Sequence, residues 1–422
     1  MTCKVNKLNL LSIKALLPIL YSIISVIVAA SYFIYLGAIQ KENIISLFGI
    51  GSTIIFLSTH ISSLGVDHSI VSDENVGNSN KKFNKDRLLF VDYRVLFPLI
   101  SIFISYLFLQ IIRLIPNNKI INEIFLDQVW FNEISFIFVL TIFLATLTKI
   151  LTSYLITSHF INLANLFYLG KSLGLLLGVV VYEFFINFNI LFIFLAMESF
   201  VFCLMFFIYI AMLKKIKWTE GNYEIKYMLS GLNVFGFDAI MKIDLLVLSF
   251  FGSNYEIARY AVLSNVFEGL SQLITSLQIK YTSMLREVIS KKEVTNYMQT
   301  EIRKLLYSTK IISLLFFPAA YVFYSLVFNL PSFSIIILIA LFQLTLFIGA
   351  APIVTFFTYS IIKRPLFLLI ITLISLISNV MLSVLLYNYL NFYGVILASL
   401  ITFISLRFTI LRKTNLLFQL QK

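Results

Sequence analysis

The chain has 422 residues, of which 60% are hydrophobic and only 12% are Asp, Glu, Lys or Arg. Soluble domains carry roughly 25% charged residues, so this composition excludes a soluble protein with an ordinary core. The formal net charge of +12 could indicate a nucleic-acid partner, but the positive residues lie at the ends of apolar runs and not on one soluble face.

Apolar runs of about 20 residues, each long enough to cross a ~30 Å hydrocarbon layer, recur along the whole chain. The first run is longer than the apolar part of a secretion signal, and no cleavage motif clearly follows it, so it is interpreted as a span. We therefore predict an all-α polytopic membrane protein with twelve transmembrane helices. The predicted spans are about 15–37, 44–66, 95–114, 134–157, 165–186, 189–212, 229–251, 256–279, 305–328, 333–358, 366–387 and 391–411.

The basic residues are distributed unequally across the predicted membrane. With the N-terminus in the cytoplasm, 23 of the 32 lysines and arginines fall on the cytoplasmic side, 3 fall outside and 6 lie within spans. This is the positive-inside pattern, and it predicts that both termini are cytoplasmic. The polar loop 213–228 divides the spans six plus six, which favours two bundles, 1–213 and 214–422, although no strong internal repeat is visible.

The sequence lacks the motifs of common catalytic and metal sites, since it has no CxxC, HExxH, glycine-rich phosphate loop or GxSxG. Two cysteines (Cys3, Cys203) and three histidines (His60, His68, His159) are too few and too scattered for a metal site. The outside loops are also short, whereas membrane enzymes that join lipid-linked sugars usually build their sites on large external loops. We expect no enzyme, no metal and no cofactor.

Polar residues inside spans must face protein or a water-filled cavity. Helical spacing aligns several of them into stripes: Ser22, Ser25 and Ala29 in the first span, Ser52, Thr59 and Ser63 in the second, Thr141, Thr148 and Thr152 with Lys149 in the fourth, and Asn265, Glu268, Gln272 and Thr275 in the eighth. Stripes of Ser, Thr and Ala also arise from close helix packing, and that alternative stays open. The stripe with Glu268 places a carboxylate near the predicted midplane, which favours a cavity lining.

The seventh predicted span contains three charged residues, Asp238, Lys242 and Asp244. Asp238 and Lys242 are four positions apart, so they share a face and can neutralise each other. Asp244 lies about 200° around the helix from Lys242 and must face a different neighbour. The sequence leaves open which of the two faces lines a cavity.

The segment KIDLLVLSFFGSNYEIARYAVLSNVFE at 242–268 resembles the polysaccharide, or O-antigen, flippases (Wzx-type) of the multidrug and oligosaccharidyl-lipid exporter (MATE-like) superfamily. The matching features, in order, are Asp244, the apolar run 245–251, the polar turn 252–256, and Tyr260 with Ala261. SSLGVDHSI at 62–70 resembles the end of the family's second span. The sequence departs from the family in IKYTSMLRE at 279–287, where members often carry a proline.

This resemblance implies two six-helix lobes around a central cavity, in a bacterial cytoplasmic (inner) membrane. It implies a substrate of undecaprenyl-diphosphate-linked oligosaccharide, which is moved from the inner to the outer leaflet for surface polysaccharide assembly. In the family, cationic cavity residues are thought to receive the anionic headgroup, and we carry that role to Lys242 and Lys149. The expected partners are this glycan, the bilayer and other polysaccharide-assembly membrane proteins, with no nucleic acid.

The remaining roles are assigned by chemistry. Sugars favour amide and hydroxyl partners, so the glycan and cavity-lining set is Asn265, Gln272, Thr275 and Asp238. Four carboxylates near mid-depth would repel a diphosphate, so some are expected to be protonated, paired or bound to a coupling H⁺ or Na⁺. We assign ion coupling to Glu268 and Glu198, and helix pairing to Asp244.

Two other functions stay open. The many carboxylates and aromatic residues, including 43 Phe and 22 Tyr, would suit a cation-coupled exporter of drugs or metabolites in the same superfamily. A polymerase or ligase of lipid-linked sugars is the third alternative, against which the short outer loops argue.

Overall fold

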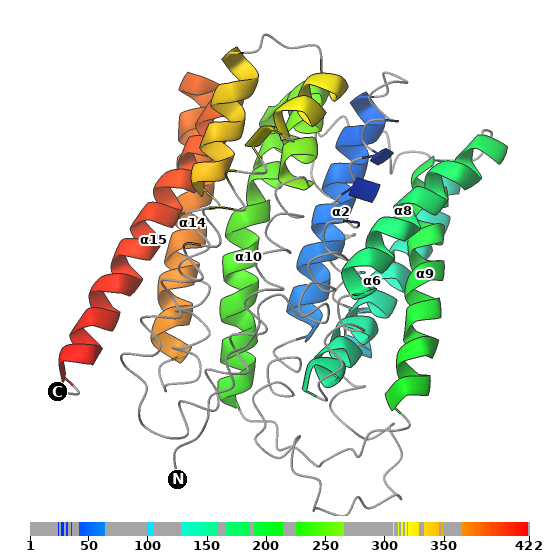
Figure 1. Ribbon diagram of the computed structural model, residues 1–422, viewed down its shortest axis with the longest axis horizontal. Helices are drawn as coiled ribbons and strands as arrows, with labels where there is room; N and C mark the ends of the chain where they lie inside the picture. Colours follow the sequence, from blue (N-terminus) through cyan, green and yellow to red (C-terminus); the bar gives the residue numbers. More distant parts are fainter. Residues whose placement is uncertain are drawn as a thin grey trace, which may run out of the picture.

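The computed structural model describes residues 42–63, 128–157, 166–185, 190–213, 225–265, 320–328, 333–345 and 365–420, with single positions within 24–35, 99–106 and 307–318 and at 348. These residues are almost wholly helical (Figure 1). The helices are α2 (Glu42–Ser63), α6 (Gln128–Thr157), α8 (Leu166–Phe184), α9 (Ile190–Leu213), α10 (Ile225–Phe251), α14 (Pro365–Leu390) and α15 (Phe392–Leu420). Residues 254–265, 320–327 and 333–345 are also helical.

Five of the described helices are long and apolar enough to cross a membrane. The apolar stretches are Ile44–Ser63, Ile134–Ser153, Phe192–Ala211, Leu366–Leu390 and Phe392–Thr409. A helix satisfies every backbone N–H and C=O within itself, so it is the structure that such apolar sequences adopt in lipid. The twelve-span count and the positions of the two termini extend beyond the described residues and stay predictions.

The outer face of α14 is apolar and exposed. Its exposed residues follow helical spacing and include Ile370, Ile374, Ile377 and Met381, of which Met381 is 68% exposed. In water such a continuous apolar stripe would be unfavourable. Hydrocarbon is the environment that suits it, since lipid tails are as apolar as these side chains.

Two helices extend well beyond the spans that the hydropathy predicts. The fourth predicted span, 134–157, corresponds to α6, which begins at Gln128. The twelfth, 391–411, corresponds to α15, which continues to Leu420. Helical hydrogen bonding does not stop where hydrocarbon ends, so polar residues beyond an apolar run can extend the helix into the interface.

The helices pack into a bundle in which α10 lies between α2 and α14 (Figure 1). α9 packs on α6 and α8, α2 packs on α6, and α14 packs on α15. The contact between α2 and α10 therefore joins the helices before the polar loop 213–228 to those after it. Whether 1–213 and 214–422 form two separate lobes stays a prediction.

A row of glycines on α8 allows that helix to approach α9 closely. Gly170, Gly174 and Gly178 are four residues apart and lie on one face. A Cβ at Gly174 would lie 2.8 Å from Cα of Glu198, which is backbone, whereas a Cβ at Gly170 would meet the flexible side chain of Met205. Small residues at this spacing are typical of helix pairs that pack backbone to backbone in membranes.

We expect Gly174→Ala to lower the thermal stability of the detergent-purified protein more than Gly170→Ala. At Gly174 the new methyl would push α8 away from α9, an overpacking that typically costs about 1–3 kcal/mol. At Gly170 the side chain of Met205 can turn aside, and alanine also favours the helix by ~1 kcal/mol. The two variants have the same chemistry and lie on the same face. A Gly174→Ala protein as stable as Gly170→Ala would show that the close packing is not needed.

The turn after α10 is held by a capping box. Ser253 N–H donates to Oε2 of Glu256 at 2.9 Å, and Glu256 N–H lies 3.3 Å from Oγ of Ser253. This reciprocal pair satisfies N–H groups at the start of the helix 254–265. The hydroxyl of Tyr387 on α14 lies 3.2 Å from the same carboxylate oxygen, so the turn is also attached to α14.

The turn from α14 to α15 uses one residue with positive φ. Asn391 has φ 50°, and its N–H donates to the carbonyl of Tyr387 at 2.8 Å. Asparagine tolerates this left-handed conformation, which commonly ends a helix. Because only Asn391 separates them, α14 and α15 run antiparallel and pack along their length.

Candidate functional site

The first polar cluster lies where α2, α6, α10 and the helix 254–265 meet. Lys242 of α10 is 5% exposed. Its Nζ donates to Oγ of Ser264 at 3.3 Å and lies 5.6 Å from the centre of the Phe56 ring of α2. A hydrogen bond and a cation–π contact thus link this lysine to helices before and after the central loop.

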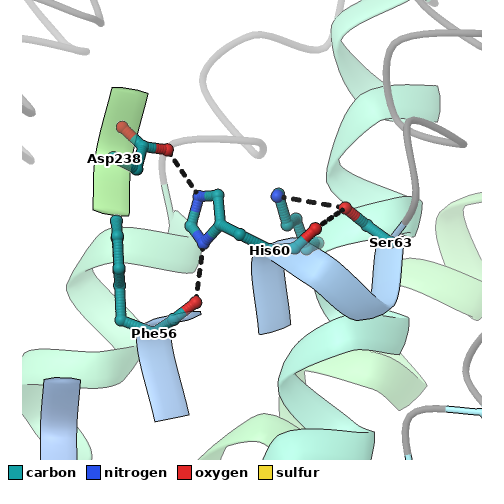
Figure 2. Close-up of polar contacts among 5 residues, drawn as sticks. Phe56, His60, Ser63 and Asp238 are labelled. Carbon is teal, nitrogen blue, oxygen red and sulfur yellow. Dashed lines mark hydrogen bonds and ion pairs between the residues drawn. The ribbon is translucent and has the colours of Figure 1, made fainter. Parts of the chain in front are cut away.

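Beside it, His60 of α2 contacts Asp238 of α10 (Figure 2). The His60 Nε2 atom lies 3.2 Å from Oδ2 of Asp238, and the two side chains are 17% and 25% exposed. The other ring nitrogen, Nδ1, lies 2.8 Å from the carbonyl oxygen of Phe56, one turn earlier on α2. The imidazole is therefore fixed at both nitrogens, and it bridges α2 to α10.

The third basic residue of this cluster is Lys149, on α6. Its Nζ donates to Oγ of Ser63 at 3.3 Å, and the Ser63 hydroxyl donates to the carbonyl of His60 at 2.9 Å. Lys149 is consequently linked to the same turn of α2 that carries His60. Two predicted polar stripes therefore meet here: the one with Ser63 on the second span and the one with Lys149 on the fourth.

Lys149, Lys242 and His60 are three basic side chains in this cluster, and of them His60 contacts the carboxylate of Asp238. Lys242 and Asp238 were expected to neutralise each other along one face of the seventh span. The structure adds a contact of Asp238 with His60 on another helix and a hydrogen bond from Lys242 to Ser264. With lysines and imidazolium charged, these four side chains carry a net positive charge.

The second polar cluster surrounds Asp244, which is fully buried at 0% exposure. Tyr260 donates to its Oδ2 at 2.7 Å, Asn379 Nδ2 donates to its Oδ1 at 3.0 Å, and Ser399 also donates to Oδ2. Ser383 lies 3.4 Å from Oδ1. These donors come from the helix 254–265, α14 and α15, so the carboxylate contacts three helices besides its own.

Asn379 extends this network along α10 and α15. Its Nδ2 lies 3.2 Å from the carbonyl oxygen of Ile240 and 3.2 Å from Oγ of Ser399, and Thr402 lies 3.4 Å from its Oδ1. Asn379 is itself 0% exposed. The second cluster is a buried hydrogen-bonded junction, in contrast to the partly exposed first cluster.

The other predicted residues are placed as follows. Glu198 on α9 is 3% exposed and lies where α9 packs against Gly174 of α8. Asn265, at the end of the described helix, donates to the carbonyl of Ala261 at 2.7 Å. Glu268, Gln272 and Thr275 lie outside the described residues, so their predicted roles stay untested.

Sequence reasoning missed His60, Asn379 and Ser399 as site residues. His60 had been considered only for metal binding; among the described residues no group of three His, Cys, Asp or Glu could hold a metal. The available signal was a titratable ring inside a predicted span, where such groups are costly. For Asn379, the signal was its four-residue spacing from Ser383 in an otherwise apolar run, which puts two polar groups on one face of α14.

No protein-family profile matches the chain, and no curated protein matches its sequence. Solved structures do match. The lipid II flippase MurJ, in an inward closed conformation, has a TM-score of 0.62 at 18% identity, covering 94% of this chain and 87% of the other. An outward-facing multidrug resistance MATE family transporter of the MOP superfamily has a TM-score of 0.59 at 13% identity, covering 93% and 92%.

A third solved structure is a MOP superfamily transporter from Pyrococcus furiosus, described as having a binding pocket of reverse polarity. Its TM-score is 0.57 at 13% identity, and the match covers 96% of this chain and 95% of the other. All three likenesses extend over nearly the whole chain. The chain therefore has the fold found in transporters of the MOP superfamily, MATE exporters and the MurJ flippase among them.

Proposed function

We propose that this protein is a flippase of the cytoplasmic (inner) membrane of a bacterium. It translocates undecaprenyl-diphosphate-linked oligosaccharide repeat units by alternating access, for O-antigen or capsule assembly. Both termini lie in the cytoplasm, and the twelve helices form two six-helix lobes, 1–213 and 214–422, around a central cavity. The fold supports the transporter class, since MOP structures in outward-facing and inward-facing conformations both match the chain.

The observation that carries the substrate class is the basic cluster between α2, α6 and α10. Charged groups are costly at membrane depth and persist there where they serve a purpose. Lys149 and Lys242 are each bonded to a serine hydroxyl in the present arrangement. A diphosphate offers several anionic oxygens, and hydrogen bonds to ionised acceptors are roughly twice as strong as those to neutral ones. The headgroup would therefore displace the serines as partner of both lysines.

Access to Lys242 requires a movement, because it is 5% exposed between α2 and α10. Alternating access supplies such a movement if the two lobes separate along the α2–α10 contact. The sugars then follow into the cavity, where Asn265, Gln272, Thr275 and Asp238 offer amide, hydroxyl and carboxylate partners. Asp244 stays a helix-pairing residue, which its four donors support.

Transport is coupled to H⁺ or Na⁺ in this proposal, through Glu268 and Glu198. We expect Glu268→Gln to abolish the dependence of transport on an ion gradient, because an amide does not take up and release a proton at neutral pH and lacks the negative charge that attracts Na⁺. The measurement is substrate movement into vesicles with and without an imposed H⁺ or Na⁺ gradient. Unchanged gradient dependence in Glu268→Gln would assign coupling elsewhere, and Glu198→Gln would then be tested in the same way.

A cation-coupled drug or metabolite exporter is the second candidate. It is favoured by the MATE exporters among the matching structures. Such a cargo is usually cationic, however, and it would be repelled by Lys149 and Lys242 if it bound beside them. An enzyme that joins lipid-linked sugars has no comparable support, because the matching structures named above are transporters and a flippase.

The proposal is tested in cells by deleting the gene in its native host. Loss of a flippase should make lipid-linked repeat units accumulate on the inner side of the membrane, and plasmid-borne protein should remove the accumulation. A Lys242→Met copy at equal membrane abundance serves as the matched negative control. Normal surface polysaccharide in the deletion strain, together with new sensitivity to cationic drugs, would favour the exporter instead.

A further inference from the structure

In the contact between His60 and Asp238, both nitrogens of the imidazole face an oxygen atom. This arrangement restricts where the protons of the pair can lie. The Nδ1 atom lies 2.8 Å from the carbonyl oxygen of Phe56, and Nε2 lies 3.2 Å from Oδ2 of Asp238 (Figure 2). A carbonyl oxygen can only accept a hydrogen bond, so Nδ1 carries a proton. The contact of Nε2 with the carboxyl group then depends on a second proton.

A neutral imidazole with a proton on Nδ1 has a lone pair on Nε2, and an ionised carboxylate is also only an acceptor. Two acceptors repel each other at this distance. The observed contact therefore needs one further proton between Nε2 and Oδ2, carried either by an imidazolium or by a protonated Asp238. In both descriptions the pair holds one proton more than a neutral histidine and a separate carboxylate.

We propose that His60 and Asp238 form a proton-binding site that holds α2 against α10, and that the proton is released to water when the two helices separate. The step moves one proton from the space between Nε2 and Oδ2 to a water molecule, and no covalent bond other than N–H or O–H changes. The two side chains are 17% and 25% exposed, so the packed helices do not seal the pair off. By linkage, a proton that binds the closed contact more tightly favours that contact at low pH.

The neighbouring charged residues affect how tightly the pair holds its proton. Lys242 lies on α10 one turn from Asp238, and Lys149 of α6 is linked through Ser63 to the carbonyl of His60. Both lysines oppose an additional positive charge, so they help the proton to leave. α9 also packs on α2, and its one carboxylic residue, Glu198, is buried at 3% exposure. The arriving anionic headgroup would neutralise the lysines and so favour keeping the proton.

This inference rests on the proposed separation of the two lobes and not on the identity of the cargo. Its test is a distance measured without substrate. Spin labels are placed at Phe207→Cys on α9 and Phe408→Cys on α15, which are 63% and 67% exposed, after the native cysteines are replaced by serine. The ends of these helices lie at the same end of the bundle, one on each side of the α2–α10 contact (Figure 1).

We expect the distance distribution of the labelled protein in nanodiscs to shift to longer values between pH 5 and pH 8, the range in which histidine changes its charge. His60→Gln should remove the shift, since its amide donates to Asp238 at any pH. Asp238→Asn should remove it too, because its amide donates to Nε2 of a neutral His60. Lys242→Met, which retains the pair, should still respond to pH.

An unchanged distribution in the parent protein across this range overturns the proposal. So does a full pH response in His60→Gln or Asp238→Asn, and if one of the two does not fold, the other decides. If only the proposed flippase function is wrong, the result differs: the labels would still respond to pH, but no lipid-linked glycan would be moved. A pH response lost only in the two pair variants, with or without glycan transport, supports the proton site itself.

Discussion

Asp244→Ala should destabilise the protein more than any other single change considered above, by about 2–5 kcal/mol. The carboxylate accepts hydrogen bonds from Tyr260, Asn379 and Ser399, and it is 0% exposed. Hydrogen bonds between membrane helices average ~0.6 kcal/mol and reach ~1.7, and buried donors left without a partner cost about 1–3 kcal/mol each. The expected result is a markedly lower unfolding midpoint in detergent and less protein in the membrane.

Two variants control for this prediction. Asp244→Asn retains an acceptor oxygen of nearly the same shape, and the hydroxyls of Tyr260 and Ser399 can rotate to accept from its amide, so its loss should be clearly smaller. Thr372→Val changes a fully buried residue of α14 whose hydroxyl bonds only to the carbonyl of Leu368 among the contacts described. It should change stability little. An Asp244→Ala protein as stable as Thr372→Val would show that the carboxylate does not hold these helices together.

Lys242→Met should reduce transport of the lipid-linked glycan by roughly 10- to 150-fold while the protein stays folded. Methionine retains much of the length and the apolar packing against Phe56 but removes the charge. Hydrogen bonds to charged groups contribute about 1.5–3 kcal/mol, and each 1.4 kcal/mol corresponds to a factor of about ten. The effect should be on transport more than on folding, because methionine keeps the apolar contact with Phe56.

Lys242→Arg is the matched variant, since it retains the charge and can contact two phosphate oxygens at once. It should transport within a few-fold of the parent protein. Lys149→Met should have a weaker effect in the same direction, because Lys149 is less enclosed. Full transport by Lys242→Met would remove the headgroup role from this residue, and equal loss in Lys242→Arg would indicate a packing effect.

Much of the fold was predictable because membrane depth imposes strong rules. Apolar runs near 20 residues predict helices, and helices stand at the predicted second, fourth to seventh, eleventh and twelfth spans. The ends were less predictable: α6 begins at Gln128 and α15 continues to Leu420, because hydropathy detects the hydrocarbon region and not the end of backbone hydrogen bonding. The shape of the bundle and its likeness to MOP structures required three-dimensional contacts.

The candidate site was only partly predictable, since the sequence places residues on a helix face but does not tell which neighbour that face meets. The spacing of Asp238, Lys242 and Asp244 correctly indicated that Asp244 faces elsewhere than Lys242. It also suggested an Asp238–Lys242 pair, which stays a prediction, and it gave no sign that Asp238 contacts His60 of α2, 178 positions earlier in the chain. Partners at that separation depend on how α2 crosses α10, which no local pattern encodes.

The most direct test of the flippase function is transfer of undecaprenyl-diphosphate-linked oligosaccharide across liposomes that contain only this purified protein. Glycan exposed on the outer leaflet is measured with an impermeant sugar-oxidising or lectin probe, beside protein-free liposomes and liposomes with Lys242→Met. We expect transfer well above the protein-free rate with the parent protein, and its loss with the variant. No transfer by the folded protein, with uptake of a cationic dye in the same liposomes, would contradict it.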